Sequence, residues 1–144
     1  MRLVPLLALL ALLAAGCGGS GTPSDPEGVV REWSSATNAG DDEKAARLFA
    51  PNAKVVQPGL KLRLRDMKTA KRWNAGLPCA GRIVDTVVEG DEVTATFQLA
   101  QRPGHRCDAP GVTAYALVQV IDGKIVLWHQ VTGPAGEDSP GQQA

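Results

Sequence analysis

The sequence has few aromatic residues, no excess of charge of either sign and only three cysteines. Aromatic residues make up 4% of the 144 positions, and 15 basic residues balance 15 acidic residues. Nucleic-acid-binding domains need clustered positive charge to meet the phosphates, so this balance gives no support for nucleic-acid binding. No internal repeat is visible. We therefore expect one small domain without a nucleic-acid partner.

The N-terminal hydrophobic run, Leu3 to Ala15, is too short to span a bilayer as a helix. It follows a single charge, Arg2, and has the length of the apolar region of a signal peptide. The Leu-Ala-Ala-Gly segment directly before Cys17 resembles the lipobox of bacterial lipoproteins. This resemblance implies a lipoprotein signal peptide that is cleaved before Cys17, and acyl chains such as palmitate on Cys17. The alternative is an ordinary secretion signal cleaved near Ala15, which leaves Cys17 as a free thiol.

The predicted lipid fixes an order of segments along the chain. Residues 1–16 form the signal peptide, and residues 17–26 form the lipidated cysteine and a flexible tether rich in Gly, Ser and Pro. Residues 27–132 are enough for one domain with a core, and residues 133–144 read as a disordered tail. We expect the protein at the cell membrane, held by its lipid on the extracytoplasmic side.

With Cys17 assigned to the lipid, Cys79 and Cys107 remain as a pair. Outside the cytoplasm such a pair most often forms a disulfide, and the loop it closes contributes on the order of 3 kcal/mol in the chain-entropy model. A metal site that also includes the nearby His105 is the alternative. One histidine and two cysteines without close C-x-x-C spacing are weak evidence for zinc. We predict a disulfide, no metal and no cofactor.

The hydrophobic pattern predicts an α+β domain. Apolar residues recur at helical spacing in the first segment, Gly40 supplies a left-handed C-terminal cap, and a second short helix ends at Phe49. Asp122-Gly123 is a hairpin signal between the last two strands. The expected helices are 27–38, a short one capped by Asp41 or Asp42, and 66–74; the expected strands are 53–57, 82–88, 93–101, 112–121 and 124–132, with strict alternation also in 60–65.

Three stretches of sequence resemble the nuclear transport factor 2-like superfamily, in particular its SnoaL-like and steroid-isomerase-like branches. They are the first helix and turn from Trp33 to Asp41, the segment Leu48-Phe-Ala-Pro-Asn-Ala-Lys-Val-Val56, and the hairpin Asp122-Gly-Lys-Ile-Val126 leading to Trp128-His129. The resemblance implies a cone-shaped fold, in which a curved antiparallel sheet is covered by about three helices. It also implies a pocket on the concave face and homodimers through the outer face of the sheet.

The resemblance allows the steroid-isomerase chemistry to be compared position by position. That chemistry needs a carboxylate base and an oxyanion hole made by a Tyr and a protonated Asp. Here the Tyr position holds Trp33, the base position before Pro58 holds Gln57, and the protonated Asp position holds Ala116. An amide takes no proton at neutral pH, and an indole cannot be tuned as a phenol can. We predict that the chain does not catalyse steroid-type enolisation, and we assign no catalytic residue.

Three other titratable residues, His129, His105 and Asp85, are candidate catalysts. His129 is a typical general base, but strand alternation places it on the opposite face from Trp128 and Gln130, so a surface or dimer-interface role is favoured. His105 falls in a loop, and Asp85 has the character of a solvated strand end. No Ser-His-Asp grouping has a supporting spacing. A SnoaL-like hydrolase or isomerase that uses a group such as His129 is the alternative to a non-catalytic domain.

The aromatic residues are candidates for the walls of a binding pocket. Most of them fall on elements that would wall the cone, and a small-molecule site needs apolar walls with a few polar groups. The same rings would equally fill the core of a small domain. The predicted lining residues are Trp33, Phe49, Gln57, Trp73, Tyr115, Trp128 and Gln130. We expect a small apolar ligand, or docking of an envelope partner if the rings plug the cone.

A cationic strip is the other notable pattern. Such a strip is usually a solvated face, and attraction to anionic phospholipid is the alternative for a domain held near a membrane. The strip consists of Lys61, Arg63, Arg65, Lys68, Lys71 and Arg72.

Overall fold

The computed structural model describes residues 23–134. The predicted signal peptide, Cys17, most of the tether and most of the C-terminal tail therefore lie outside the described residues. The described helices are α1 (Pro26–Asn38), α2 (Asp42–Arg47) and α3 (Met67–Ala75). The described strands are β1 (Phe49–Gln57), β2 (Leu60–Leu64), β3 (Ala80–Glu89), β4 (Glu92–Ala100), β5 (Thr113–Ile121) and β6 (Lys124–Val131).

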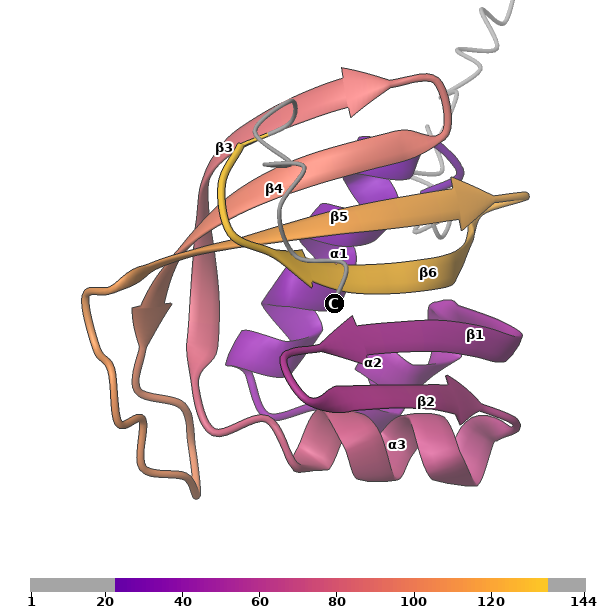
Figure 1. The fold of residues 1–144 in the computed structure, drawn as a ribbon. Helices are drawn as coiled ribbons and strands as arrows, with labels where there is room; N and C mark the ends of the chain where they lie inside the picture. The colour runs from indigo at the N-terminus through magenta and orange to yellow at the C-terminus, as the bar shows by residue number, and fades with distance from the viewer. Residues whose placement is uncertain (1–22, 135–144) are drawn as a thin grey trace, which may run out of the picture.

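The six strands form one curved sheet in the order β2-β1-β6-β5-β4-β3. Neighbouring strands are antiparallel except β1 and β6, which are parallel. Register shifts interrupt the pairing of β1 with β6, β3 with β4 and β5 with β6, and such bulges bend a sheet. Figure 1 shows α1 crossing behind the sheet and α3 running along its β2 edge. The predicted α+β class and curved sheet with three helices are confirmed.

Aspartate caps start all three helices. Asp25 accepts a hydrogen bond from the Gly28 N–H, with Pro26 in the first turn, and Asp41 accepts one from Lys44. Asp66 forms a capping box at the start of α3, as the sequence indicates. The side-chain oxygen satisfies a backbone donor that has no partner inside the helix, which is why these positions favour Asp.

The junction between α2 and β1 corrects the sequence interpretation. The predicted second helix ended at Phe49, whereas α2 ends at Arg47 and Phe49 already belongs to β1. Phe49 pairs with Ile125 of β6, and the Ile125 N–H donates to the Leu48 carbonyl. Pro51 is accommodated inside the strand because it falls within the register shift, where a missing N–H breaks no ladder bond. Tertiary pairing therefore extends the strand expected to start at residue 53.

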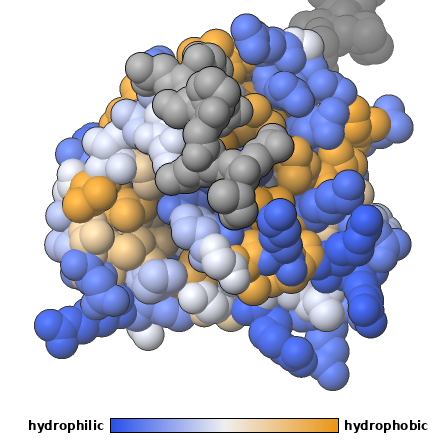
Figure 2. All heavy atoms as spheres, viewed as in Figure 1, coloured by the Kyte–Doolittle hydropathy of each residue, from blue (hydrophilic) through white to orange (hydrophobic). Residues whose placement is uncertain are grey.

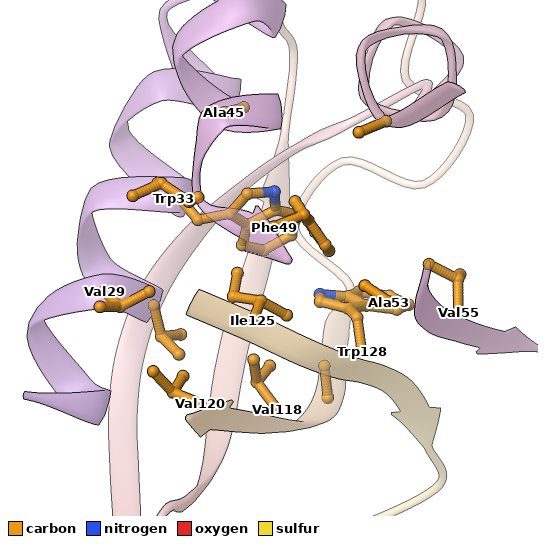
Figure 3. Packing of buried hydrophobic residues seen from close by; sticks show 14 of the residues in the cluster. Val29, Trp33, Ala45, Phe49, Ala53, Val55, Val118, Val120, Ile125 and Trp128 are labelled. Atoms are coloured by element: carbon orange, nitrogen blue, oxygen red, sulfur yellow. The ribbon is translucent and has the colours of Figure 1, made fainter. Parts of the chain in front are cut away.

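The core lies between α1 and the concave face of the sheet. Val29, Val30 and Trp33 of α1 meet Val118 and Ile125 of the sheet, and all five are buried. In Figure 3 the labelled Val29 and Trp33 lie on the helix side of the core and the labelled Val118 and Ile125 on the sheet side, with Trp33 above Ile125. Burial of each such side chain is worth roughly 1.5–3 kcal/mol, so this face holds the helices on the sheet.

Cys79 and Cys107 form a disulfide, which confirms the predicted pair over the metal alternative. The bond joins the segment before β3 to the loop between β4 and β5. In residues 23–134, no three His, Cys, Asp or Glu side chains gather as metal ligands. None of the described helices is long and apolar enough to cross a membrane.

A buried arginine ties the same loop to the helices. The Arg102 guanidinium donates to the carbonyls of Asn74 and Leu77 at 2.9 and 3.0 Å, and to the Asp42 carboxylate at 2.7 Å. Its side chain is fully buried, whereas the Asp42 side chain is 19% exposed. One cation thus connects the β4–β5 loop with the start of α2 and the end of α3.

Candidate ligand-binding site

A cavity of about 250 Å³ lies between the C-terminal half of α1 and the concave face of the sheet. The disulfide closes one side of it through Cys79, and the floor is made by small residues of β5. The lining residues are Trp33, Ser34, Thr37, Asn38, Gln57, Leu77, Pro78, Cys79, Gly81, Phe97, Leu99, Ala114, Tyr115, Ala116, Trp128 and Gln130.

Polar side chains of α1 fix the helix to β3 beside the cavity. Asn38 accepts from the Gly81 N–H at 2.8 Å and donates to the Gly81 carbonyl at 3.1 Å. The Ser34 hydroxyl donates to the same carbonyl at 2.7 Å. A Cβ at position 81 would lie 2.9 Å from the Phe97 ring, so only glycine allows this close approach. These bonds keep the helix at a fixed distance from the sheet.

All three tryptophans and both phenylalanines form one contiguous cluster. The Trp33 ring centroid lies 5.8 Å from that of Trp128 and 6.3 Å from that of Trp73. The Trp33 indole N–H donates to the buried Asn74 side chain at 2.8 Å. The Trp73 indole N–H donates to the Gln57 side-chain oxygen at 3.2 Å. The rings therefore both fill the core and hold the polar groups of the cavity wall.

The structure separates the seven predicted lining residues into three groups. Trp33, Gln57, Trp128 and Gln130 line the cavity. Tyr115 also borders it, but strand alternation places its side chain opposite to those of Ala114 and Ala116, on the convex face.

Phe49 and Trp73 are not part of the lining. Phe49 is buried and makes an edge-to-face contact with Trp73, with ring centroids 5.5 Å apart, and Trp73 supports Gln57 from behind. Trp73 packs against Trp33 and Trp128, and Phe49 packs against Trp73, so both rings belong to the core cluster and not to the cavity lining.

Sequence reasoning missed the polar residues that α1 adds to the cavity. Thr37 lies four residues after Trp33, and Asn38 lies four residues after Ser34, so all four lie on adjoining parts of one helix face. That spacing was the available signal. The spacing alone does not single out these residues, because Ser, Thr and Asn are also common at exposed helix positions.

The three positions compared with steroid isomerases meet at this cavity, since Trp33, Gln57 and Ala116 all line it. None of the cavity's described lining residues carries an ionisable group except Tyr115, whose side chain is directed away, and the disulfide-bonded Cys79. His129 pairs with Leu117 and Val56, on the convex side from Trp128.

The other titratable candidates also lie elsewhere. His105 is in the exposed β4–β5 loop and Asp85 is exposed on β3. The pKa values of three carboxyls are held below their usual values by hydrogen bonds, and all three are on the surface. Glu27 is bonded by Thr86 and Arg31, Glu43 by Arg47, and Asp66 by the Thr69 backbone N–H. Among the described side chains that line the cavity there is no imidazole or carboxylate, and the amides of Gln57 and Gln130 are its main hydrogen-bonding groups from the sheet.

A model of the SnoaL-like domain family matches residues 30–128. The chain belongs to the SnoaL-like domain family. A search of the curated proteins found no match. Among solved structures, the SnoaL-like domain resembles an NTF2-like protein of unknown function from Cytophaga hutchinsonii ATCC 33406, with a TM-score of 0.64 and 15% identity over 78% of this chain and 94% of that one.

Two further neighbours of the SnoaL-like domain carry names that suggest activities. One is a putative polyketide cyclase from Sinorhizobium meliloti, with a TM-score of 0.60 and 20% identity over 72% of this chain and 93% of that one. The other is a hypothetical protein with a ketosteroid isomerase-like fold from Catenulispora acidiphila DSM 44928, in complex with trimethylamine; its TM-score is 0.60, at 18% identity over 76% of this chain and 87% of that one. At these identities the likeness concerns the fold.

Proposed function

We propose that this SnoaL-like domain is carried outside the cell by a lipid-anchored bacterial lipoprotein, and that its cavity binds a small uncharged molecule without transforming it. The observation that carries the proposal is the composition of the cavity wall. Apolar walls and side-chain amides surround a space of about 250 Å³, without a charged group from the described residues. Ligand sites commonly enclose ~300–1,000 Å³, so the expected ligand is small.

The arrangement of the polar groups supports a binding role. Enolisation needs a proton acceptor beside the substrate, and Gln57 offers an amide held by the Trp73 indole. The Trp33 N–H, the remaining donor at the compared positions, is already bonded to Asn74. The amides of Gln57 and Gln130 supply hydrogen bonds that orient a ligand.

The proposed anchor rests on the N-terminal sequence. One arginine, a leucine- and alanine-rich run and a small-residue segment before Cys17 come in the order that lipoprotein processing requires. The disulfide between Cys79 and Cys107 is consistent with an oxidising compartment outside the cytoplasm.

A SnoaL-like hydrolase or isomerase acting on a small hydrophobic substrate is the second candidate. The observation in its favour is that the aromatic rings leave the cavity partly open, with Gln57 at its wall. The same open space counts against the third hypothesis, a plugged cone that serves only to dock an envelope partner. The absence of an imidazole or carboxylate among the cavity's described side chains ranks the enzyme below the binding protein.

Native mass spectrometry of the protein purified from its own host tests the binding proposal. We expect an added mass that denaturation removes and that Ala114→Phe, which places a ring in the cavity, abolishes. Thr113→Phe is the matched control, because Thr113 is exposed on the neighbouring position of β5 and faces the other way. Unliganded protein, or loss of the ligand in both variants, would contradict the proposal. The same spectra show whether the protein forms a homodimer. The family resemblance predicts a homodimer that associates through the convex face of the sheet.

Membrane fractionation tests the anchor. Cys17→Ala removes the predicted acylation site, so we expect the variant to leave the membrane fraction and to remain unprocessed by the lipoprotein pathway. If the variant stays in the membrane fraction to the same extent as the unaltered protein, the proposed lipid anchor is wrong.

A further inference from the structure

Four cations project from one face of the sheet at its β1–β2 edge. The strand register places Lys54 directly opposite Arg63 and Lys61 opposite Val56. All three cations are exposed, and Arg65 follows at the end of β2. Val55 and Leu64, which alternate with the cations along β1 and β2, are buried in the core on the concave side, so these cations stand on the convex side.

The cations line a groove of about 660 Å³. Its lining residues are Lys54, Val55, Val56, Lys61, Leu62, Arg63, Arg65 and Thr69, and they include neither Asp nor Glu. Five ion pairs occur among residues 23–134, and none involves these four cations. Like charges opposite each other on a ladder destabilise a sheet, so Lys54 beside Arg63 has an electrostatic cost that an anion would relieve.

The groove differs from the cationic strip expected from the sequence. Lys71 lies 3.5 Å from Glu43 and is partly neutralised by it. Lys68 and Arg72 are on α3 and take no part in the groove, whereas Lys54, which the strip omitted, joins it through strand pairing. The chain has no net charge, so four cations in one groove, with no acidic partner among the described residues, make this part of the surface locally positive.

Apolar side chains lie among these cations. Val56, which is opposite Lys61 in the strand register and partly exposed, lines the groove together with Val55 and Leu62. Figure 2 shows hydrophilic side chains over the region of β1 and β2, with hydrophobic surface beside them. Cations next to exposed apolar side chains are the combination that binds the headgroup region of a bilayer.

We propose that this groove is a docking surface for the headgroups of anionic phospholipid. The proposal takes the location of the domain from the lipid anchor proposed above. Pro23 and Ser24 lie against Gly123 in the β5–β6 turn. Six residues from Cys17 to Pro23 span about 20 Å at full extension, so the anchor keeps the domain beside the bilayer. Contact through the groove then orients the cavity relative to the membrane.

Co-sedimentation with vesicles tests the proposal. The chain from residue 17 onward with Cys17→Ser carries no lipid, so any binding comes from the protein surface. We expect it to bind vesicles that contain phosphatidylglycerol and phosphatidylcholine, and to bind pure phosphatidylcholine vesicles far more weakly. A cation near an anionic surface contributes about fivefold to affinity, so Lys61→Gln with Arg63→Gln should weaken binding by about 25-fold.

The matched control is Arg82→Gln with Arg106→Gln, which removes the same charge. Arg82 and Arg106 are exposed and lie outside the groove, on β3 and the β4–β5 loop. We expect a change of less than about twofold for this pair. If the two double variants lose vesicle affinity equally, or if the protein binds both vesicle types equally, the groove is not a docking surface for anionic phospholipid. Release of the lipidated protein by Cys17→Ala is a separate readout, so failure of the groove and failure of the anchor are distinguishable.

Discussion

The buried polar groups around the aromatic cluster show how single residues determine its packing. Asn74 is fully buried, and three of its polar groups form hydrogen bonds. Its side-chain oxygen accepts from the Trp33 indole N–H, and its side-chain NH2 donates to the Ala70 carbonyl. Its backbone carbonyl accepts from Arg102. A buried indole N–H without an acceptor costs about 1–3 kcal/mol. Asn74 therefore determines the orientation of Trp33, which is central to the cluster and lines the cavity.

The contact between Trp33 and Asn74 gives a double-mutant prediction. Asn74→Leu alone leaves the Trp33 N–H buried without a partner, and it should lower the free energy of unfolding by about 2–3 kcal/mol. Trp33→Phe with Asn74→Leu removes both partners, so its loss should fall short of the summed single losses by about 1 kcal/mol. Urea denaturation of the four proteins measures this coupling. Additive losses would show that the hydrogen bond has no part in holding the ring.

At the scale of helices and strands, the features encoded locally were predictable. Asp41 and Asp66 cap their helices, and the Asp122-Gly123 turn has positive φ at both residues, as the hairpin signal requires. Such signals depend on neighbours within a few residues. The start of β1 was missed because Phe49 becomes a strand residue through its pairing with Ile125, which lies far along the chain.

Less of the candidate site was predictable from the sequence, because it depends on contacts between residues that are far apart in the chain. Alternation placed Trp128 and Gln130 on one face of β6 and His129 on the other, and the structure has this arrangement. Alternation within β5 also places the Tyr115 side chain on the convex face, but the prediction used its residue type instead. The exclusion of Trp73 from the cavity depends on the packing of five rings from different elements, which no local pattern contains.

The cap of α3 gives a prediction at the element scale. The Thr69 backbone N–H donates to the Asp66 carboxylate at 2.8 Å, and this hydrogen bond is the main cause that lowers the pKa of Asp66 below its ordinary value of 3.8. A lowered pKa stabilises the folded state above the unfolded pKa, and this stabilisation is lost as the pH falls through the folded pKa. Asp66→Asn keeps a capping side chain but does not titrate. The difference in unfolding free energy between the two proteins should therefore be constant above about pH 5 and shrink toward pH 2.

Urea titrations across this range measure that difference. Glu27 and Glu43 also have lowered pKa values and contribute to the acid sensitivity of both proteins, so they cancel in the comparison. A difference that stays the same from pH 6 to pH 2 would contradict the assigned role of the carboxylate.

At the scale of the whole molecule, one loop connects the cavity with the helices. The segment between β4 and β5 is joined to the start of β3 by the disulfide and to α2 and α3 by Arg102. Gln101 closes the loop on itself, because its side chain donates to the Cys107 carbonyl and accepts from the Cys107 N–H. Cys79 lines the cavity, so the order of this loop determines how well one wall of the cavity is defined.

Removal of the disulfide is the prediction at this scale. Cys79 and Cys107 are separated by 28 positions, and a crosslink of this span stabilises by on the order of 3 kcal/mol, mainly through the unfolded chain. Cys79→Ser with Cys107→Ser should therefore lower the Tm by roughly 10 °C. We expect the variant to remain folded, because Arg102 and the hydrophobic core hold the sheet and helices without the bond. Thermal unfolding followed by circular dichroism, with the reduced unaltered protein as control, measures the shift. The cavity also loses one fixed wall, so the amount of ligand retained in native mass spectra should decrease. If both the Tm and the retained ligand stay unchanged, the hydrogen bonds of the loop hold it without the disulfide, and the prediction is wrong.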